Sequence, residues 1–292
     1  MVTGATTYND LYLDIRRTLL KADSGAASLE ARELVMAASG KTKDEFYRDS
    51  RLYVPEAVRR SVSELLERRL GGEPIAYIAG SWEFYGITLH ITPDVLIPRI
   101  DTEMLARTAI EELETRSGHT RVLDLCCGSG CVGIAVARNV RDCNVVLGDS
   151  SGDALRVAMR NVRSNGLSSR MLCVEMDALR MPDPSLGEFD VIVCNPPYIK
   201  TGDIETLDQS VSRFEPRAAL DGGADGLDFY RAVSRSWKDS IKDGGAVFFE
   251  CGIGMALDVA DILEDAGFTE IGIVKDIENI DRVVCASVKR EV

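Results

Sequence analysis

The segment Asn195-Pro196-Pro197-Tyr198 limits the chemistry of this sequence more than any other. It follows the run from Phe189 to Cys194, which is largely apolar and rich in β-branched residues, as a buried strand would be. Two prolines end that strand, because proline cannot donate to a strand ladder and restricts the residue before it. An asparagine amide and nearby carbonyls can bind a planar amino group, and a tyrosine can offer a flat wall. The segment therefore predicts a pocket for an amino or amide group; a proline-rich turn with a capping asparagine is the alternative interpretation.

A second candidate site is the glycine-rich turn 126–130, which lies between a predicted strand and a predicted helix. With Gly133 it forms the pattern G-x-G-x-x-G, which alone is only a weak indication of dinucleotide binding. Asp124 precedes this turn, and its carboxylate would repel a pyrophosphate but suits the amino group or the sulfonium of S-adenosylmethionine. The glycines let the backbone pass close to a ligand. The cofactor-binding residues predicted here are Asp124, Cys126, Cys127, Gly128, Ser129 and Gly130.

Two further carboxylates end predicted strands. Asp149 ends the next strand, at a place where an acidic residue can accept both ribose hydroxyls. Asp177 ends the third strand, where it can accept from the adenine amino group with Ala178 beside the ring. Each aspartate alone could equally be a strand-end cap. Together with the glycine-rich turn they predict a binding site for S-adenosylmethionine, which Asn195 completes.

Such a site needs a sheet that brings several strand ends to one edge. From Asp101 onward, predicted strands and helices alternate, and the helix 101–115 opens with Asp101-Thr102-Glu103 as its capping sequence. The predicted strands are 122–126, 145–149, 171–177, 191–194, 246–250, 270–275 and 282–288. Alternation of this kind predicts an α/β fold with a Rossmann-like, mostly parallel seven-stranded sheet, closed by an antiparallel pair at the C-terminal end.

The first part of the chain has a different character. Apolar residues recur at helical spacing up to Leu70, and Gly71-Gly72 follows them. From Ile75 to Ile91, aromatic and β-branched residues around two glycines favour a hairpin. We therefore expect a helical N-terminal domain at 1–74, a β-hairpin linker at 75–97 and a catalytic domain at 98–292.

Composition excludes several classes of protein. The chain has 292 residues and a net charge of −13, most of it after residue 97, which disfavours a general nucleic-acid binder. It shows no signal peptide and no apolar run long enough for a membrane helix, so we expect a cytoplasmic protein without a membrane partner. The eight cysteines form no C-x-x-C pair, which favours buried reduced thiols over a metal site. The two histidines, His90 and His119, lie outside the predicted sites.

Several motifs together resemble class I S-adenosylmethionine-dependent methyltransferases, and more narrowly the peptide chain release factor N5-glutamine methyltransferases. The motif N-P-P-Y is shared with methyltransferases of adenine and cytosine amino groups, so it identifies only the acceptor chemistry. Phe214-Glu215-Pro216 and Asp221-Gly222-Gly223 also belong to the match. The segments that make the resemblance specific are the helical N-terminus, Gly72-Glu73-Pro74-Ile75-Ala76-Tyr77 and Leu96-Ile97-Pro98-Arg99. The resemblance covers nearly the whole chain.

The resemblance implies methyl transfer to the glutamine of the Gly-Gly-Gln motif in class 1 peptide chain release factors, with the helical domain docking that partner. It implies that Asn195 and the Pro196 carbonyl hold the acceptor amide while Pro197 and Tyr198 line the pocket. Direct in-line transfer needs no strong base, which agrees with the absence of a nearby histidine. Glu215 lies in a long loop, 199–227, that could close over the substrate; a solvated loop charge is the alternative.

Two departures and two rival functions accompany this interpretation. Cys126 stands where the family usually has glycine, which is tolerable if its backbone is extended, and 276–282 lacks the usual glycine. One rival is an adenine-N6 or cytosine-N4 nucleic-acid methyltransferase, which would need a basic groove. The other is a cofactor-binding scaffold without activity, which an intact N-P-P-Y motif disfavours.

Overall fold

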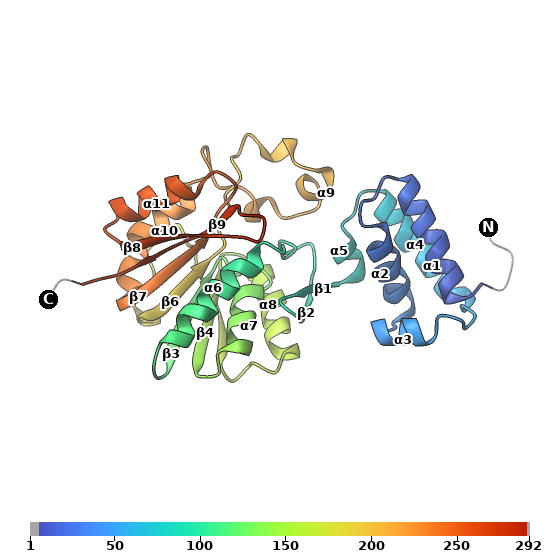
Figure 1. The fold of residues 1–292 in the computed structure, drawn as a ribbon, viewed down its shortest axis with the longest axis horizontal. Coiled ribbons are helices and arrows are strands. Elements are labelled where there is room, and N and C mark those ends of the chain that lie inside the picture. The colour runs from blue at the N-terminus through green and yellow to red at the C-terminus, as the bar shows by residue number, and fades with distance from the viewer. Residues whose placement is uncertain (1–5, 291–292) are drawn as a thin grey trace. The chain divides into compact units, whose positions relative to one another are not determined.

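The computed structural model describes residues 6–290, which divide into two compact units. One unit is helical and comprises the described residues up to Trp82 together with Asp208–Phe214. The other comprises Glu83–Leu207 and the described residues from Glu215 onward, and it contains the large sheet. Figure 1 labels the elements of both units. Within the described residues, no helix has both the length and the apolar character that crossing a bilayer requires.

The helical unit is built around one apolar cluster that includes Leu19, Leu34 and Val62. Thr7 and Thr42 cap two of its helices through side-chain bonds to the backbone three residues later, so both helices begin with a capping box. Its helices are α1 (Tyr8–Lys21), α2 (Ala27–Ser39), α3 (Lys43–Arg48), α4 (Glu56–Leu70), α5 (Ile75–Ala79) and α9 (Gln209–Ser212).

The prediction of a hairpin from residue 75 is wrong for its first residues. Residues 75–79 form the short helix α5, which ends at Gly80 with φ +69°. Ile75 and Ile78 pack into the core of the helical unit, and this burial decides between helix and strand for so short an apolar run. The hairpin itself is confined to β1 (Ser81–Phe84) and β2 (Ile87–His90), so the predicted domain boundary at 74 falls too early.

The second unit contains the predicted seven-stranded sheet, with strand order β5-β4-β3-β6-β7-β9-β8. The pairs from β5 to β7 are parallel, whereas β9 runs antiparallel to both β7 and β8, which confirms the predicted fold. Its strands are β3 (Thr120–Leu125), β4 (Cys143–Asp149), β5 (Met171–Glu175), β6 (Phe189–Cys194), β7 (Ile241–Glu250), β8 (Thr269–Lys275) and β9 (Asp281–Ser287).

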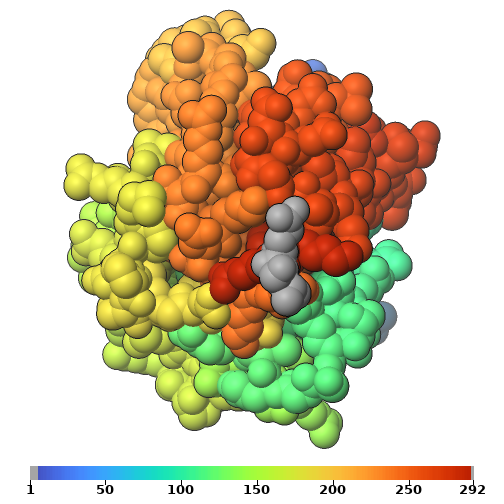
Figure 2. Space-filling model, turned by 90° about the vertical axis from the view of Figure 1, so that its left-hand side faces the viewer, coloured from blue at the N-terminus to red at the C-terminus, as the bar shows by residue number. Residues whose placement is uncertain are grey.

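Helices cover both faces of this sheet (Figure 1). On one face lie α6 (Thr102–Thr115), α7 (Cys131–Asn139) and α8 (Gly152–Ser164), and on the other lie α10 (Asp228–Ser236) and α11 (Ala256–Asp265). Figure 2 views the molecule from one side, where the green segment that includes α6 and the red-orange segment that includes α11 form separate regions of the visible surface. The central strands β3 and β6 are buried almost throughout, as expected for parallel strands between two helix layers.

Asp101 does not cap helix α6 as the sequence predicts. It occupies the N-cap position with helical backbone angles and makes no side-chain capping bond. Its carboxylate instead forms an ion pair with Arg282 of β9, at 3.0 Å. The Asp101 carboxylate therefore pairs with a charged residue of a distant strand and does not cap the helix. Sequence spacing alone cannot indicate such a partner.

Candidate functional site

The predicted site residues meet because three neighbouring parallel strands end at the same edge of the sheet. Leu125 of β3 pairs with Gly148 of β4 on one side and with Cys194 of β6 on the other. The residues that follow these positions are the glycine-rich turn, Asp149 and Asn195. Ligands of open α/β sheets bind at this edge. The strand register thus brings together side chains that lie far apart in the sequence.

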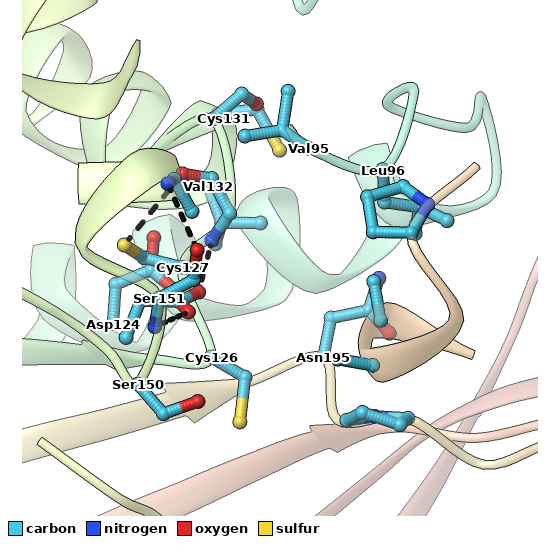
Figure 3. A pocket seen from close by; sticks show the side chains of 18 of the residues that line it. Val95, Leu96, Asp124, Cys126, Cys127, Cys131, Val132, Ser150, Ser151 and Asn195 are labelled. Atoms are coloured by element: carbon cyan, nitrogen blue, oxygen red, sulfur yellow. Dashed lines mark hydrogen bonds between the residues drawn. The ribbon is translucent and has the colours of Figure 1, made fainter. Parts of the chain in front are cut away.

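A cavity of about 990 Å³, counted with its open mouth, lies at this edge. Figure 3 shows Asn195 across the cavity from Asp124 and Ser151. Of the predicted site residues, those that line the cavity are Asp124, Cys126, Cys127, Gly128, Ser129, Asp149, Ala178, Asn195 and Pro197. A cavity at the carboxyl ends of parallel strands with a few convergent polar groups is typical of a small-molecule site.

Four predicted residues are not part of the cavity wall described by the structure: Gly130, Asp177, Pro196 and Tyr198. Gly130 lies behind the turn, where it begins α7 with φ +78° and packs against Leu147 and Ala158. Strand β5 ends at Glu175 rather than at Asp177, and the Asp177 carboxylate accepts from the Leu179 backbone N–H at 2.9 Å. The binding of adenine by Asp177 stays a prediction, and the neighbouring Met176 and Ala178 do line the cavity.

Asp124 is buried in the wall of the cavity, with only 2% of its surface exposed. Its Oδ2 atom accepts the backbone N–H of Gly133 at 2.7 Å, at the start of α7. Burial raises the pKa of this carboxyl to about 7, and the nearby Asp149 adds to the rise, while the Gly133 bond opposes it. No described cation neutralises Asp124, so the site is suited to a positively charged ligand.

Asp149 is already bound to the backbone of the turn. Its Oδ2 atom accepts from the Gly128 N–H and its Oδ1 atom from the Ser151 N–H, both at 2.9 Å. Each carboxylate oxygen can accept a second bond, so the carboxylate can hold the turn and still receive two hydroxyl groups. Burial raises the pKa of Asp149, and these backbone bonds oppose the rise. Gly128 has φ +52°, and no atom lies within 4 Å of the position a Cβ would take, so this turn leaves open space for a ligand.

The backbone at Cys126 is not extended, so the condition under which the sequence analysis considers a cysteine tolerable there is not met. Cys126 has φ +61°, in the left-handed region that side chains rarely adopt. This explains why a glycine would suit the position better. The thiol packs in part against the core beneath the sheet, beside the buried thiol of Cys194.

Asn195 lines the cavity, and its side-chain amide has a defined orientation. The Nδ2 atom donates to the Oγ1 atom of Thr102, at the start of α6, over 3.3 Å. The Oδ1 atom is therefore the end of the amide that is left for a ligand. Tyr198 is largely buried and its hydroxyl donates to Oε1 of Glu250 at 3.5 Å; burial raises the pKa of Tyr198.

Glu215 is not the solvated loop charge that the sequence left open. It is 6% exposed, and its carboxylate accepts from the backbone N–H of Ile97 at 3.2 Å and from the guanidinium of Arg99. The chain on either side of these bonds lines the cavity: Leu96 and Pro98 from one segment, Pro216 and Ala218 from the other. Glu215 thus links two segments of the cavity wall through hydrogen bonds and an ion pair.

Sequence reasoning missed the site roles of Thr102, Met176, Phe229 and Glu250. Thr102 is part of a motif that the sequence assigns to helix capping, and Met176 follows a strand directly. Phe229 and Glu250 carry no local signal, because their relation to the site exists only once α10 and β7 are packed. Neither His90 nor His119 lines the cavity, and within the described residues no group of side chains is arranged to hold a metal ion.

Comparison with known proteins agrees with this architecture. The family described as "Methyltransferase small domain" matches residues 100–218, and the one described as "PrmC N-terminal domain" matches residues 10–80. Among solved structures, the hMettl16 catalytic domain in complex with a 3'UTR hairpin aligns with a TM-score of 0.57 at 15% identity. That alignment covers 71% of this chain and 78% of the other, and at this identity it shows a shared fold.

Two curated relatives are much closer in sequence. The release factor glutamine methyltransferase of Clostridium botulinum is 32% identical over 277 residues, which cover 95% of this chain and 98% of the relative. That of Geobacter sulfurreducens is 39% identical over 261 residues and 88% of each chain. Similarity of this extent, spanning both the helical unit and the sheet, shows that the chain belongs to the release factor glutamine methyltransferase family.

Proposed function

We propose that this chain transfers a methyl group from S-adenosylmethionine to the side-chain amide nitrogen of the glutamine in the Gly-Gly-Gln motif of a class 1 peptide chain release factor. The observation that carries the proposal is the orientation of Asn195. Thr102 occupies its Nδ2 atom, so Oδ1 is the end available to accept an N–H of an incoming amide. Asp124 lies across the cavity from Asn195 (Figure 3), and Asp149 also lines the cavity; both carboxylates suit the cofactor.

The residues present fit S-adenosylmethionine. Asp124 is a buried carboxylate without a described cation beside it, which suits the positively charged amino group. Asp149 retains acceptor capacity for two ribose hydroxyls. Met176, Ala178 and Phe229 give the cavity an apolar wall for a flat ring. When bound, the cofactor supplies a methyl group activated by its sulfonium.

In this mechanism the protein aligns a weak nucleophile. Asn195 Oδ1 and the Pro196 carbonyl accept the two N–H hydrogens of the acceptor amide, which points the nitrogen into the cavity and increases its electron density. Holding the reacting groups at attack distance can supply roughly 7–11 kcal/mol of the barrier. The acceptor nitrogen would take the methyl group from the cofactor, held by Asp124 and Asp149, and would then lose a proton to water. Tyr198 does not line the cavity described by the structure, and its proposed part is to bound the acceptor amide once the substrate is in place.

The helical unit, on this proposal, docks the release factor, and the reaction takes place in the cytoplasm. The nucleic-acid alternative shares the pocket chemistry. A net charge of −13 opposes close approach of a phosphate backbone, which supports a protein acceptor over a nucleic acid.

The proposal is tested with methyl-labelled S-adenosylmethionine, a purified class 1 release factor and adenine-containing DNA. We expect one added methyl group on the Gly-Gly-Gln peptide, none on DNA, and loss of the transfer in Asn195→Ala while cofactor binding is kept. Asn144→Ala, at an exposed position of β4, is the matched control and should retain full activity. Label on DNA instead would move the assignment to the nucleic-acid alternative, and near-normal transfer by Asn195→Ala would sink the mechanism.

A further inference from the structure

The buried residues of helix α8 include one polar side chain, Asn161, which the proposed mechanism does not use. The others are apolar: Ala154, Leu155, Val157, Ala158 and Val162. Asn161 is fully buried, and a buried amide is costly unless it is hydrogen-bonded. It is not one of the described residues that line the cavity. Its hydrogen-bond partners therefore indicate its role.

Three hydrogen bonds join the Asn161 side chain to two segments that lie far from it in the sequence. Its Oδ1 atom accepts the backbone N–H of His90 at 2.6 Å, and its Nδ2 atom donates to the His90 carbonyl at 3.0 Å. The Nδ2 atom also donates to the Ser129 carbonyl at 3.0 Å. Because both hydrogens of the amide are used, its orientation is fixed. One side chain thus connects the end of β2 to the glycine-rich turn 126–130.

Both of these segments form part of the cofactor cavity. The turn contributes four residues to its wall and the chain that follows His90 contributes four more: Cys126, Cys127, Gly128 and Ser129, and Asp94, Val95, Leu96 and Pro98. Figure 3 labels residues of both sets around one cavity. Asn161 binds His90 directly before the segment 91–96, and Glu215 binds the backbone N–H directly after it, at Ile97. Buried side chains therefore hold this segment at both ends, and Asn161 also connects it to the turn.

We propose that Asn161 is a positioning residue for S-adenosylmethionine, which holds the segment 91–96 at the distance from the glycine-rich turn that the cofactor requires. The inference rests on the proposed function of the site, whose cofactor it concerns. Since Asn161 lies outside the described cavity wall, it acts through the backbone of His90 and Ser129. Its loss should loosen two walls of the cavity and leave the acceptor motif as it is.

Two variants of Asn161 test this role through cofactor affinity. Asn161→Asp places a carboxylate oxygen against two carbonyl oxygens, and Asn161→Ala removes all three hydrogen bonds. If a variant holds both walls in place for only a tenth of the time, its dissociation constant for S-adenosylmethionine, measured by calorimetry, should rise about tenfold. At saturating cofactor, kcat for the release factor should stay within about threefold, because the acceptor motif is unchanged. Asn139→Asp is the matched control, since Asn139 is exposed and bonds Ala135 of its own helix, and it should bind the cofactor like the unchanged protein.

Hydrogen exchange of the cofactor-free protein gives a readout that does not depend on activity. The His90 N–H donates to Asn161, so in Asn161→Ala it should exchange at least about tenfold faster. Amides of the buried strands β3 and β6 should exchange at the same rate in variant and unchanged protein, whereas a general loss of stability would accelerate them too. In the unchanged protein, S-adenosylmethionine should slow exchange in 91–96 and in 126–130 together, because one side chain connects them.

Failure of the inference and failure of the proposed function give different results. If the unchanged protein does not bind S-adenosylmethionine, or binds it without methylating a release factor, the proposed function is overturned. If it does both, and the two variants keep dissociation constants within about twofold of its own, the inference alone is overturned. The inference is equally overturned if kcat at saturating cofactor falls as far as the affinity does, since Asn161 would then act on the acceptor chemistry.

The unchanged protein decides the matter if neither variant folds. Cofactor that slows exchange in only one of the segments 91–96 and 126–130 would show that Asn161 does not couple them, and slowing of both supports the inference.

Discussion

Cys126 holds a backbone conformation that usually belongs to glycine, at the turn that faces the cofactor cavity. A left-handed conformation costs a residue with a Cβ roughly 1–2 kcal/mol, whereas glycine loses about 0.5–1 kcal/mol more through chain entropy. Cys126→Gly should therefore stabilise the protein slightly and raise the midpoint of thermal unfolding by up to about 4 °C. Cys127→Gly, at a buried position whose φ is not positive, should lower that midpoint. If Cys126→Gly lowered the unfolding midpoint as much as Cys127→Gly does, the inference that Cys126 is strained would be contradicted.

Asp124 should release a proton when S-adenosylmethionine binds. Its pKa is about 7 without the cofactor because of burial, and a cation beside it would lower that pKa. Calorimetry in two buffers of different ionisation enthalpy should show release of about half a proton at pH 7 and almost none at pH 9. Asp124→Asn should abolish the release. Binding without proton exchange at pH 7 in the unchanged protein would show that no cation approaches Asp124.

The same carboxyl affects stability in a defined direction. Because folded Asp124 binds its proton more tightly than an ordinary aspartate, the cofactor-free protein loses stability as the pH rises from 3.8 to about 7. Asp124→Asn should therefore be more stable than the unchanged protein above pH 7. Denaturant unfolding at pH 5 and pH 8 measures this, with the larger gain expected at pH 8.

At the residue scale, the sequence predicts groups whose position follows from the end of a strand. Asp149 and Asn195 come directly after apolar runs, so their place at the sheet edge could be predicted. Thr102 and Glu250 could not be found in this way, because they meet Asn195 and Tyr198 across 93 and 52 residues of chain. Their roles depend on hydrogen bonds between elements, and these exist only after the sheet and α6 have packed.

At the scale of elements, the Glu215 ion pair should control how firmly the loop 199–227 is held to the cavity. The Glu215 side chain is 1% exposed and that of Arg99 is 36% exposed, so removing the arginine leaves a buried carboxylate with only the Ile97 N–H. Arg99→Met should cost about 1–3 kcal/mol of unfolding free energy and weaken cofactor binding. In the double variant with Glu215→Gln, part of the lost unfolding free energy should be recovered, because the buried charge is gone.

A double-mutant cycle on this pair is the measurement. Unfolding free energies of the two single variants and the double variant should not add, with a coupling of about 0.5–3 kcal/mol. Arg107→Met, at an exposed ion pair on α6, is the matched control and should be almost neutral. Additive effects would show that the loop is held by its other contacts.

Elements whose pattern is long and regular could be predicted, and short ones could not. The strands of the sheet match their predicted positions closely, because each is an apolar run between turn residues. The sequence favours a strand at residues 75–79, which form a helix instead, since five residues, four of them buried, carry no distinct period. The membership of Asp208–Phe214 in the helical unit had no sequence signal, because it depends on contacts with residues such as Gly72 far earlier in the chain.

At the scale of the whole molecule, the cavity and the proposed docking role belong to different units. Each unit has a buried core of its own, and all residues that line the cavity come from Glu83–Leu207 and the part of the chain after Glu215. A fragment of residues 83–292 should therefore bind S-adenosylmethionine with an affinity within about threefold of the full chain. That binding is also the check that the fragment is folded.

The fragment should differ from the full chain in its choice of acceptor. If the helical unit docks the release factor, it raises the local concentration of the Gly-Gly-Gln tip at the cavity. Linking two binding sites in this way can increase the overall affinity by 10²- to 10⁴-fold. The fragment should lose about that factor in kcat/KM for the whole release factor, measured by transfer of labelled methyl groups. A short peptide that contains Gly-Gly-Gln cannot use the docking surface, so fragment and full chain should methylate it at similar rates. Equal activity of both on the whole release factor would mean that the sheet unit alone recognises its partner.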